Sequence, residues 1–418
     1  MTPLAAGLSE HLIATGHSAT LALNQKSQAL AAQNHDIYRF GFGQSPFPVP
    51  HHIVDALRSA AANKAYAPVQ GLPCLRESAA HFHGTLADTP WREDRVIIGA
   101  GSKILLFALL AALRNADVAV VAPGWVSYAP QARLAGHAVH YLPSRAVDHW
   151  RLQPETLRTF CESRDNAERP VVLILNYPGN PSGTSYTQDE LTALVPILRE
   201  HNVCVVSDEI YGLLHHRGEH FSLATLYPEG TIVSTGLSKW CGAGGWRLGL
   251  VHVPEALGPE YFDAVIGVCS ETFSCASTPI QYAATAAYED QSQTLDYLSQ
   301  QRAVLSRLGA SCAQMLEAAD IETAFPEGGF YLFPDFGRHR EKLAKCDILD
   351  SGTLCQRLLE EAGVALLPGT EFGMPQQELT ARLAYVDFDG SPILDGNTPD
   401  VSRVLTGVEA INDWVTQL

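Results

Sequence analysis

Three side chains follow two apolar runs of the chain and could act together on one ligand. Lys239 follows Thr231–Thr235, and a lysine at the end of a buried strand can act as an amine nucleophile. Asp208 follows Val203–Val206, with Tyr211 three residues later. A carboxylate at a buried strand end needs a partner, and a protonated ring nitrogen would be one. The alternatives are an ordinary surface lysine and a helix cap at Asp208.

Two glycine-rich segments could bind a phosphate group. Gly99–Lys103 reads Gly-Ala-Gly-Ser-Lys and opens an apolar helix after Val96–Ile98. Free N–H groups at such a helix start bind phosphate, although Ile104 breaks the G-x-G-x-x-G pattern and a plain strand-to-helix turn is the alternative. Arg247, beside several glycines, could pair with a phosphate through two hydrogen bonds.

A tryptophan and an asparagine follow two further predicted strands. Trp125 comes after Val118–Ala122 and could stack on a flat ligand, or simply belong to the core. Asn180 lies in a Pro- and Gly-rich loop after Val171–Leu175 and could point its amide inward, or belong to a polar loop. Together with the lysine, the carboxylate and the phosphate segments, these residues supply what is needed to hold pyridoxal phosphate.

The segments that must position these residues alternate between strand-like and helix-like patterns. Short β-branched runs are separated by stretches such as the predicted helix Thr187–His201. This order predicts an α/β fold with a mostly parallel sheet covered on both faces, whose ligand binds at the carboxyl ends of the strands. A long amphipathic helix is predicted from Ser292 toward Ala319, followed by shorter elements of a smaller α+β domain.

The chain resembles the class I/II aminotransferases, pyridoxal-phosphate enzymes of fold type I, from about Gly41 to Ala384. The resemblance implies a large domain with a seven-stranded sheet and a homodimer with shared active sites. We expect residues 1–50 to form an arm that joins the small domain, residues 51–300 the large domain and residues 301–418 the small one. The matching segments, in family order, are GFGQSPFPVP, YAPVQGLPCLR, GAGSK, PGWVSY, NYPGNPSG, SDEIYG, GLSK…GGWRLG, GGFYLF, LLPGTEFG and RLAYVDF.

The resemblance also implies catalytic roles. Lys239 would form the Schiff base with the cofactor and then shuttle a proton between the substrate Cα and the cofactor C4′. Asp208 would pair with the pyridine nitrogen. Tyr211 and Asn180 would hydrogen-bond the ring oxygen, and Trp125 would stack on the ring.

For the phosphate and the substrate, the resemblance implies a second group of residues. Arg382 would bind the substrate α-carboxylate, with the Gly43 backbone nearby and Trp125 and Asn180 beside the substrate. Tyr66 would reach the phosphate of the neighbouring subunit. The phosphate ligands within the chain would be Gly101, Ser102, Lys103, Ser238 and Arg247, of which Lys103 is not the usual family residue.

Two departures from the family pattern affect the prediction. Gly236 occupies the position where many members carry a serine hydroxyl for the phosphate. No second arginine marks a site for a side-chain carboxylate, so the sequence does not support aspartate or glutamate specificity. We expect transfer of an amino group from an L-amino acid to a 2-oxo acid in a ping-pong cycle. A β-lyase or decarboxylase of the same fold, and a cofactor-binding regulatory domain, are the alternatives.

Charge and composition narrow the partners and the compartment. The 28 basic and 45 acidic residues give a net charge of −17, which disfavours nucleic acid and anionic membranes as partners. No helix-turn-helix precedes the fold, which argues against the regulatory domain. The N-terminus lacks the pattern of a secretory signal, and nine scattered cysteines suggest free thiols, so we expect a cytoplasmic protein. The paired histidines lack zinc-site spacing, and no metal site is expected.

Overall fold

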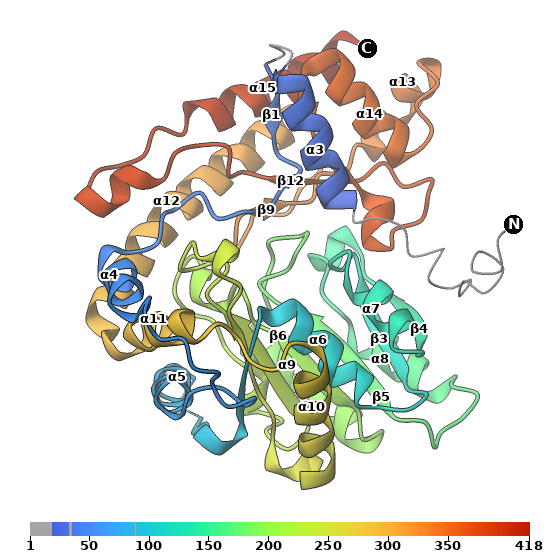
Figure 1. Ribbon diagram of the computed structural model, residues 1–418. Helices are drawn as coiled ribbons and strands as arrows, with labels where there is room; N and C mark the ends of the chain where they lie inside the picture. The colour runs from blue at the N-terminus through green and yellow to red at the C-terminus, as the bar shows by residue number, and fades with distance from the viewer. Residues whose placement is uncertain (1–18, 33–35, 88) are drawn as a thin grey trace, which may run out of the picture.

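A computed structural model of the protein describes residues 19–32, 36–87 and 89–418. A large sheet with its helices forms one half of the molecule, and smaller sheets with further helices form the other (Figure 1). Helices α3 (Ala19–Ala32) and α15 (Ser402–Gln417) both lie in the smaller half. Residues 1–18 and 33–35 of the predicted N-terminal arm lie outside the described residues. The domain limits stay a prediction, and the limit at residue 300 falls within α12 (Gln291–Ala318).

The large sheet has seven strands and confirms the predicted fold class. Only β8 runs antiparallel to its neighbours, and all other pairs are parallel. A mostly parallel sheet brings the carboxyl ends of its strands to one edge. In spatial order the strands are β2 (Val96–Gly99), β8 (Gly249–His252), β7 (Thr231–Gly236), β6 (Cys204–Asp208), β5 (Val171–Asn176), β3 (Asp117–Ala122) and β4 (Ala138–Pro143).

Alternating side chains of the central strands pack into two separate cores. Val172 and Ile174 of β5 belong to one core, whereas Leu173 belongs to the other. This alternation follows from the period of two along a strand, and it explains why the β5 sequence is apolar at nearly every position. The helices that supply apolar residues are α6 (Ser102–Ala111) and α10 (Pro259–Thr272) for the first core, and α8 (Pro154–Glu162) and α9 (Gln188–Glu200) for the second.

Helix α9 begins where the sequence predicts it, and its start has a local cause. Thr187 and Glu190 form a reciprocal capping box, in which each side chain accepts a hydrogen bond from the other residue's backbone N–H. Such a box satisfies two free N–H groups of the first turn. The predicted long helix is confirmed as α12.

The smaller half contains two small sheets and the helices around them. Strands β11 (Leu367–Pro368), β12 (Ala381–Ala384) and β9 (Tyr331–Leu332) form an antiparallel sheet in that order, and β1 (Tyr38–Arg39) pairs with β10 (Val364–Ala365). Segments from both ends of the described chain therefore meet here. Among the described residues, the other α-helices of this half are α13 (Arg340–Lys345) and α14 (Ser351–Ala362), whereas α4 (His51–Ala60), α5 (Pro73–Leu86), α7 (Tyr128–Leu134) and α11 (Thr278–Glu289) lie with the large sheet (Figure 1).

Asp387 joins the N-terminal and C-terminal segments of this half. The carboxylate is 3% exposed and pairs with Arg39 at 3.1 Å and with Arg403 of α15 at 3.1 Å. It also accepts a hydrogen bond from the Arg39 backbone N–H. The surrounding segment is a loop, and Asp387 provides a fixed link between the N-terminal and C-terminal segments.

Candidate active site

A cavity of about 370 Å³ lies at the carboxyl ends of β5, β6 and β7. This volume is in the range of small-molecule sites. Most residues that the sequence predicts for the site come together here, because the parallel strands end at the same edge. The predicted residues that line the cavity are Gly43, Ser102, Lys103, Trp125, Asn180, Asp208, Tyr211, Ser238, Lys239 and Arg247.

Asp208, the last residue of β6, is a buried carboxylate that has hydrogen bonds but no ion pair with any described residue. Tyr128 donates its hydroxyl to Asp208 Oδ2 at 2.6 Å, and the Ile210 N–H donates to Oδ1 at 3.3 Å. Within the described residues Asp208 has no ion pair. Burial raises the pKa of Asp208 to about 6, although the Tyr128 hydrogen bond lowers it. A protonated ring nitrogen would supply the cation that this carboxylate lacks, and this fits pyridoxal phosphate.

Lys239 points its amine into the cavity from the segment after β7. Its Nζ donates to the Gly43 carbonyl oxygen at 2.7 Å and lies 5.5 Å from the centre of the Tyr211 ring. The Tyr211 hydroxyl hydrogen-bonds the Tyr331 hydroxyl at 2.8 Å. Burial, together with Tyr331, raises the pKa of Tyr211 well above its usual value, so Tyr211 is a neutral hydrogen-bonding group.

Arg382 lies directly behind Asn180 and is 1% exposed. Its Nη1 donates to Asn180 Oδ1 at 3.0 Å and its Nη2 to the Gly41 carbonyl oxygen at 2.7 Å. The buried Nε has no partner among the described residues. A buried N–H group without a partner is costly, and a carboxylate ligand beside Asn180 would offer it an acceptor.

The start of α6 and the glycine-rich segment before β8 form one wall of the cavity. Gly101 has a φ of 95°, which favours glycine, and a Cβ there would lie 2.2 Å from Arg247 Nη2, so a side chain would also displace the guanidinium. Burial and the nearby Arg247 charge lower the pKa of Lys103. Free N–H groups of a helix start beside two cations suit a phosphate.

The structure explains why position 236 is a glycine and not a serine. It lies opposite Gly249 in the β7–β8 pair, and a Cβ at position 236 would lie 2.8 Å from both the Gly249 Cα and the Leu248 carbonyl oxygen. A side chain there would require the two strands to move apart. The missing serine is therefore linked to the close approach of β8.

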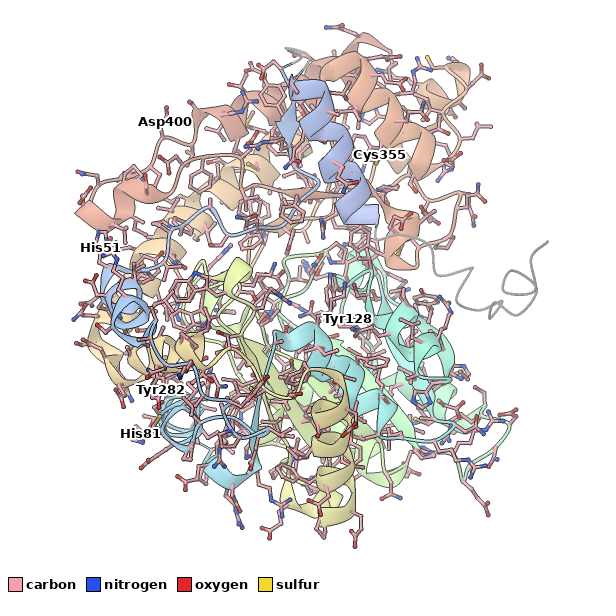
Figure 2. All side chains as sticks on the ribbon, viewed as in Figure 1. His51, His81, Tyr128, Tyr282, Cys355 and Asp400 are labelled. Carbon is pink, nitrogen blue, oxygen red and sulfur yellow. The ribbon has the colours of Figure 1, made fainter. Side chains whose placement is uncertain are left out.

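The sequence does not predict several residues of the site. Tyr128, which bonds Asp208, and Asn176, whose Nδ2 donates to the Asp208 carbonyl oxygen at 2.8 Å, both line the cavity. Figure 2 labels Tyr128 where the two halves of the molecule meet. Asn176 ends β5 and Tyr128 begins α7, and each lies within four residues of a predicted site residue, Asn180 or Trp125. The other lining residues not predicted are Phe42, Gln44, Ile210, Gly244 and Gly245.

Tyr66, His51 and His81 lie away from this cavity. Tyr66 is 90% exposed and does not line it. His51 and His81 lie at the periphery of the molecule, on α4 and α5 (Figure 2). Among the described residues no cluster of His, Cys, Asp or Glu is arranged to hold a metal ion. In the same part of the chain, no helix is long and apolar enough to cross a membrane.

Comparison with known proteins gives matches along most of the chain. The family model for aminotransferase class I and II matches residues 35–386. An aspartate aminotransferase of Bacillus subtilis is 32% identical over 386 residues, covering 90% of this chain and 94% of the relative. An aspartate/prephenate aminotransferase of Thermus thermophilus is 33% identical over 373 residues, covering 88% and 91%. The solved structure of aspartate aminotransferase from Thermus thermophilus with maleate superposes with a TM-score of 0.85 at 29% identity, covering 97% and 99%.

Proposed function

Because the chain belongs to the class I and II aminotransferase family, we propose that its cavity binds pyridoxal phosphate and transfers an amino group from an L-amino acid to a 2-oxo acid in a ping-pong cycle. The chain is an aminotransferase, and this family generally uses that cofactor. The observation that carries the proposal is that the Lys239 amine and the Asp208 carboxylate, which has no ion pair with any described residue, line the same cavity.

Each residue of the cavity has a role in this proposal. Bound pyridoxal phosphate would supply an aldehyde for an amine and a ring that withdraws electrons from the substrate Cα. Asp208 would hold the proton on the ring nitrogen, with Tyr128 fixing the carboxylate. Tyr211 and Asn180 would bind the ring oxygen. The Lys239 Nζ, once free of the cofactor, would accept the proton that leaves Cα.

A few cationic side chains would bind the cofactor phosphate and the substrate α-carboxylate. Arg247 and the first turn of α6, with Ser102, would hold the phosphate, and Ser238 would add a hydroxyl. Arg382 would hold the α-carboxylate, since its guanidinium is kept in place by Asn180 and the Gly41 carbonyl oxygen. A buried arginine that already has fixed partners binds a carboxylate with little loss of side-chain entropy.

Lys103 supports a substrate with a second carboxylate. Its ammonium lies 5.5 Å from the centre of the Trp125 ring and lines the cavity, and it forms no ion pair with any described residue. The curated relatives carry names of aspartate aminotransferases, and a solved relative binds maleate. The resemblance implies that Lys103 binds the phosphate, but Arg247 and the start of α6 can hold that group, and no second arginine lines the cavity among the described residues. We therefore assign the side-chain carboxylate of a dicarboxylic substrate to Lys103.

The subunit arrangement and the compartment complete the proposal. Tyr66 is exposed in the single chain, so its ring is free to enter the cavity of a second subunit and contact the phosphate there. All nine cysteines lie in the described part of the chain and are free, which suits the reducing cytosol. A homodimer predicts that mixed dimers of Tyr66→Phe and Lys239→Ala subunits regain activity that neither parent has.

The test is a half-reaction with single amino acids. Enzyme loaded with pyridoxal phosphate is mixed with one L-amino acid at a time, and both the cofactor absorbance and the 2-oxo acid are followed. We expect one equivalent of oxo acid per site and conversion of the cofactor to its amine form, with aspartate among the fastest. Lys239→Ala should lose the reaction. Release of ammonia with pyruvate, instead of a stoichiometric oxo acid, would contradict the proposal.

A further inference from the structure

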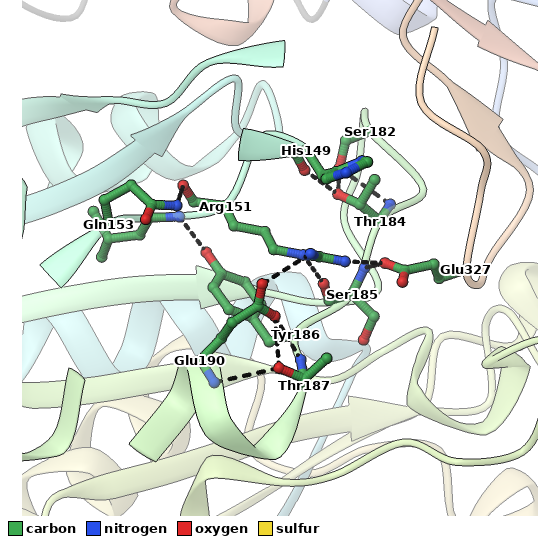
Figure 3. A network of polar contacts seen from close by, with 11 residues as sticks. His149, Arg151, Gln153, Ser182, Thr184, Ser185, Tyr186, Thr187, Glu190 and Glu327 are labelled. Atoms are coloured by element: carbon green, nitrogen blue, oxygen red, sulfur yellow. Dashed lines mark hydrogen bonds and ion pairs between the residues drawn. The ribbon is translucent and has the colours of Figure 1, made fainter. Parts of the chain in front are cut away.

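A largely buried arginine outside the cavity contacts two loops of the proposed site. One loop carries Asn180, and the other leads to Tyr331, which bonds Tyr211. Arg151, 13% exposed, donates from Nη1 to Glu190 Oε1 at 2.9 Å and from Nη2 to Glu327 Oε2 at 2.7 Å. Its Nε donates to the Ser185 carbonyl oxygen. Figure 3 shows the side chain extended between these three partners. The three partners of the guanidinium therefore lie on the two loops of the site and at the start of α9.

The first loop carries Asn180. Gly183 N–H donates to the Gly179 carbonyl oxygen and Gly179 N–H to the Thr184 carbonyl oxygen, each at 2.8 Å, so the turn around Asn180 is closed on itself. The Thr184 hydroxyl donates to the His149 carbonyl oxygen at 2.8 Å. Together with the Arg151–Ser185 bond, this anchors the turn to the segment 149–151.

The second loop leads from Glu327 to Tyr331. Glu327 Oε2 also accepts from the Ser185 N–H at 2.7 Å. The Glu327 and Gly328 N–H groups both donate to the Gly183 carbonyl oxygen, at 2.8 and 3.0 Å. Tyr331 then bonds the Tyr211 hydroxyl at 2.8 Å, and its ring lies 4.9 Å from the Arg382 guanidinium. The two loops therefore share one set of contacts.

We propose that Arg151 is a positioning residue of the aminotransferase site, which sets Asn180 and Tyr211 at the correct separation by holding these two loops together. The inference rests on the proposed function, because it takes Asn180 and Tyr211 as ligands of the cofactor ring oxygen and Arg382 as the substrate clamp. Without the guanidinium, Glu190 at the start of α9 and Glu327 on the second loop would each lose their cation. The Glu327 side chain is 34% exposed, so it could turn toward solvent and release the second loop.

The experiment measures binding rather than activity alone. Arg151→Met and Glu327→Gln are compared with Arg164→Met, a matched control. Arg164 is also buried, pairs with Asp117 at 3.0 Å and donates to two backbone carbonyls, but it lies at the opposite edge of the sheet. The dissociation constant of pyridoxal phosphate from the apoenzyme, that of maleate from the holoenzyme, and Tm are measured for each variant.

We expect Arg151→Met to weaken both cofactor and maleate binding by about tenfold or more, since small displacements of positioning groups have effects up to about a hundredfold. Glu327→Gln should weaken them in the same direction by a smaller factor. Arg164→Met should lower Tm while both constants stay within about twofold of the wild-type values.

The outcomes separate this inference from the proposed function. Constants of Arg151→Met and Glu327→Gln within twofold of wild type, or changed no more than in Arg164→Met, would show that Arg151 does not position the site. If Arg151→Met does not fold, Glu327→Gln decides alone. Tyr211→Phe is the reference: if it leaves cofactor binding unchanged, the proposed function is wrong and the inference falls with it. If Tyr211→Phe weakens cofactor binding but Arg151→Met and Glu327→Gln do not, only the inference is wrong.

Discussion

Replacing Asp208 with Asn should stabilise the apoenzyme, although it removes the partner proposed for the cofactor ring. Asp208 is 3% exposed, and its described partners are the Tyr128 hydroxyl and the Ile210 N–H. Neither partner carries a positive charge. An ionised carboxylate that is buried without a cation costs free energy of folding, and Asn keeps the shape while removing the charge.

The pKa of Asp208 sets the size of the effect. Burial raises that pKa from 3.8 to about 6. At about 1.4 kcal/mol per pKa unit, the ionised carboxylate costs the folded apoenzyme about 3 kcal/mol. Unfolding entropy of about 2.1 cal/mol/K per residue over 418 residues is about 0.9 kcal/mol/K. The expected gain in Tm for Asp208→Asn is therefore about 3 °C where Asp208 is fully ionised.

The pH dependence has a definite sign. Between pH 3.8 and about pH 6 the folded state binds a proton on Asp208 more tightly than the unfolded state does. The contribution of Asp208 to the free energy of unfolding therefore falls as the pH rises through this window. Above about pH 6 the full penalty is present, and below about pH 4 it is nearly absent. The difference in Tm between Asp208→Asn and wild type should thus shrink as the pH falls.

The assay is thermal unfolding of cofactor-free wild type and variant at pH 8 and at pH 4, with Asp117→Asn as the matched control. Asp117 is also a buried aspartate of the same sheet, but it pairs with Arg164 at 3.0 Å, with Arg169 at 3.4 Å and with His140 at 3.1 Å. Although burial raises its pKa, hydrogen bonds from Arg164 and His140 lower it below the usual value. Removing one partner of such a cluster costs about 3 kcal/mol, so Asp117→Asn should lower Tm at pH 8.

Two results would refute the reasoning. One is an equal Tm for Asp208→Asn and wild type at pH 8. The other is a difference between them that stays the same at pH 4, because a difference independent of pH would not come from the Asp208 charge. Added pyridoxal phosphate should raise Tm more in wild type than in Asp208→Asn, since only the carboxylate gains a cation from the ring nitrogen.

Two further substitutions test neighbouring residues. Lys103→Ser should raise the KM for aspartate by about tenfold and leave that for a monocarboxylic amino acid such as alanine nearly unchanged, because one charged hydrogen bond is worth about 1.5–3 kcal/mol; equal effects on both substrates, together with weaker cofactor binding, would instead assign Lys103 to the phosphate. Tyr128→Phe removes the hydroxyl donor of Asp208, so the pH midpoint of the Asp208-dependent change in Tm should move above its wild-type position, and an unmoved midpoint would contradict the role of this hydrogen bond.

The sequence predicts the site well where its residues follow strand ends. The apolar runs of β5, β6 and β7 are recognisable because both faces of these strands are buried, and parallel strands end together at one edge. Asp208 and Lys239 therefore line one cavity although they belong to different strands. The division of the molecule into two halves is harder to predict from the sequence, because the smaller half joins segments from both ends of the chain, as the pairing of β1 with β10 shows.

Contacts between distant segments explain what the sequence does not reveal. Tyr128 reaches Asp208 from the first turn of α7, and Arg151, in the segment between β4 and α8, reaches Glu327, 176 residues further along the chain. Neither contact leaves a local pattern, because both partners have ordinary neighbours in the sequence. A distant contact also explains Gly236, which departs from the family pattern. A side chain there would collide with Gly249 on another strand.

The charge distribution gives these observations a common physical basis. A net charge of −17 repels an anionic cofactor and dicarboxylic substrates at long range, so binding depends on cations that are not already neutralised. Arg151 and Arg164 pair with carboxylates, whereas Arg247, Arg382 and Lys103 form no ion pair with any described residue. The paired arginines stabilise the fold, and the unpaired cations at the cavity remain available for the anionic ligands.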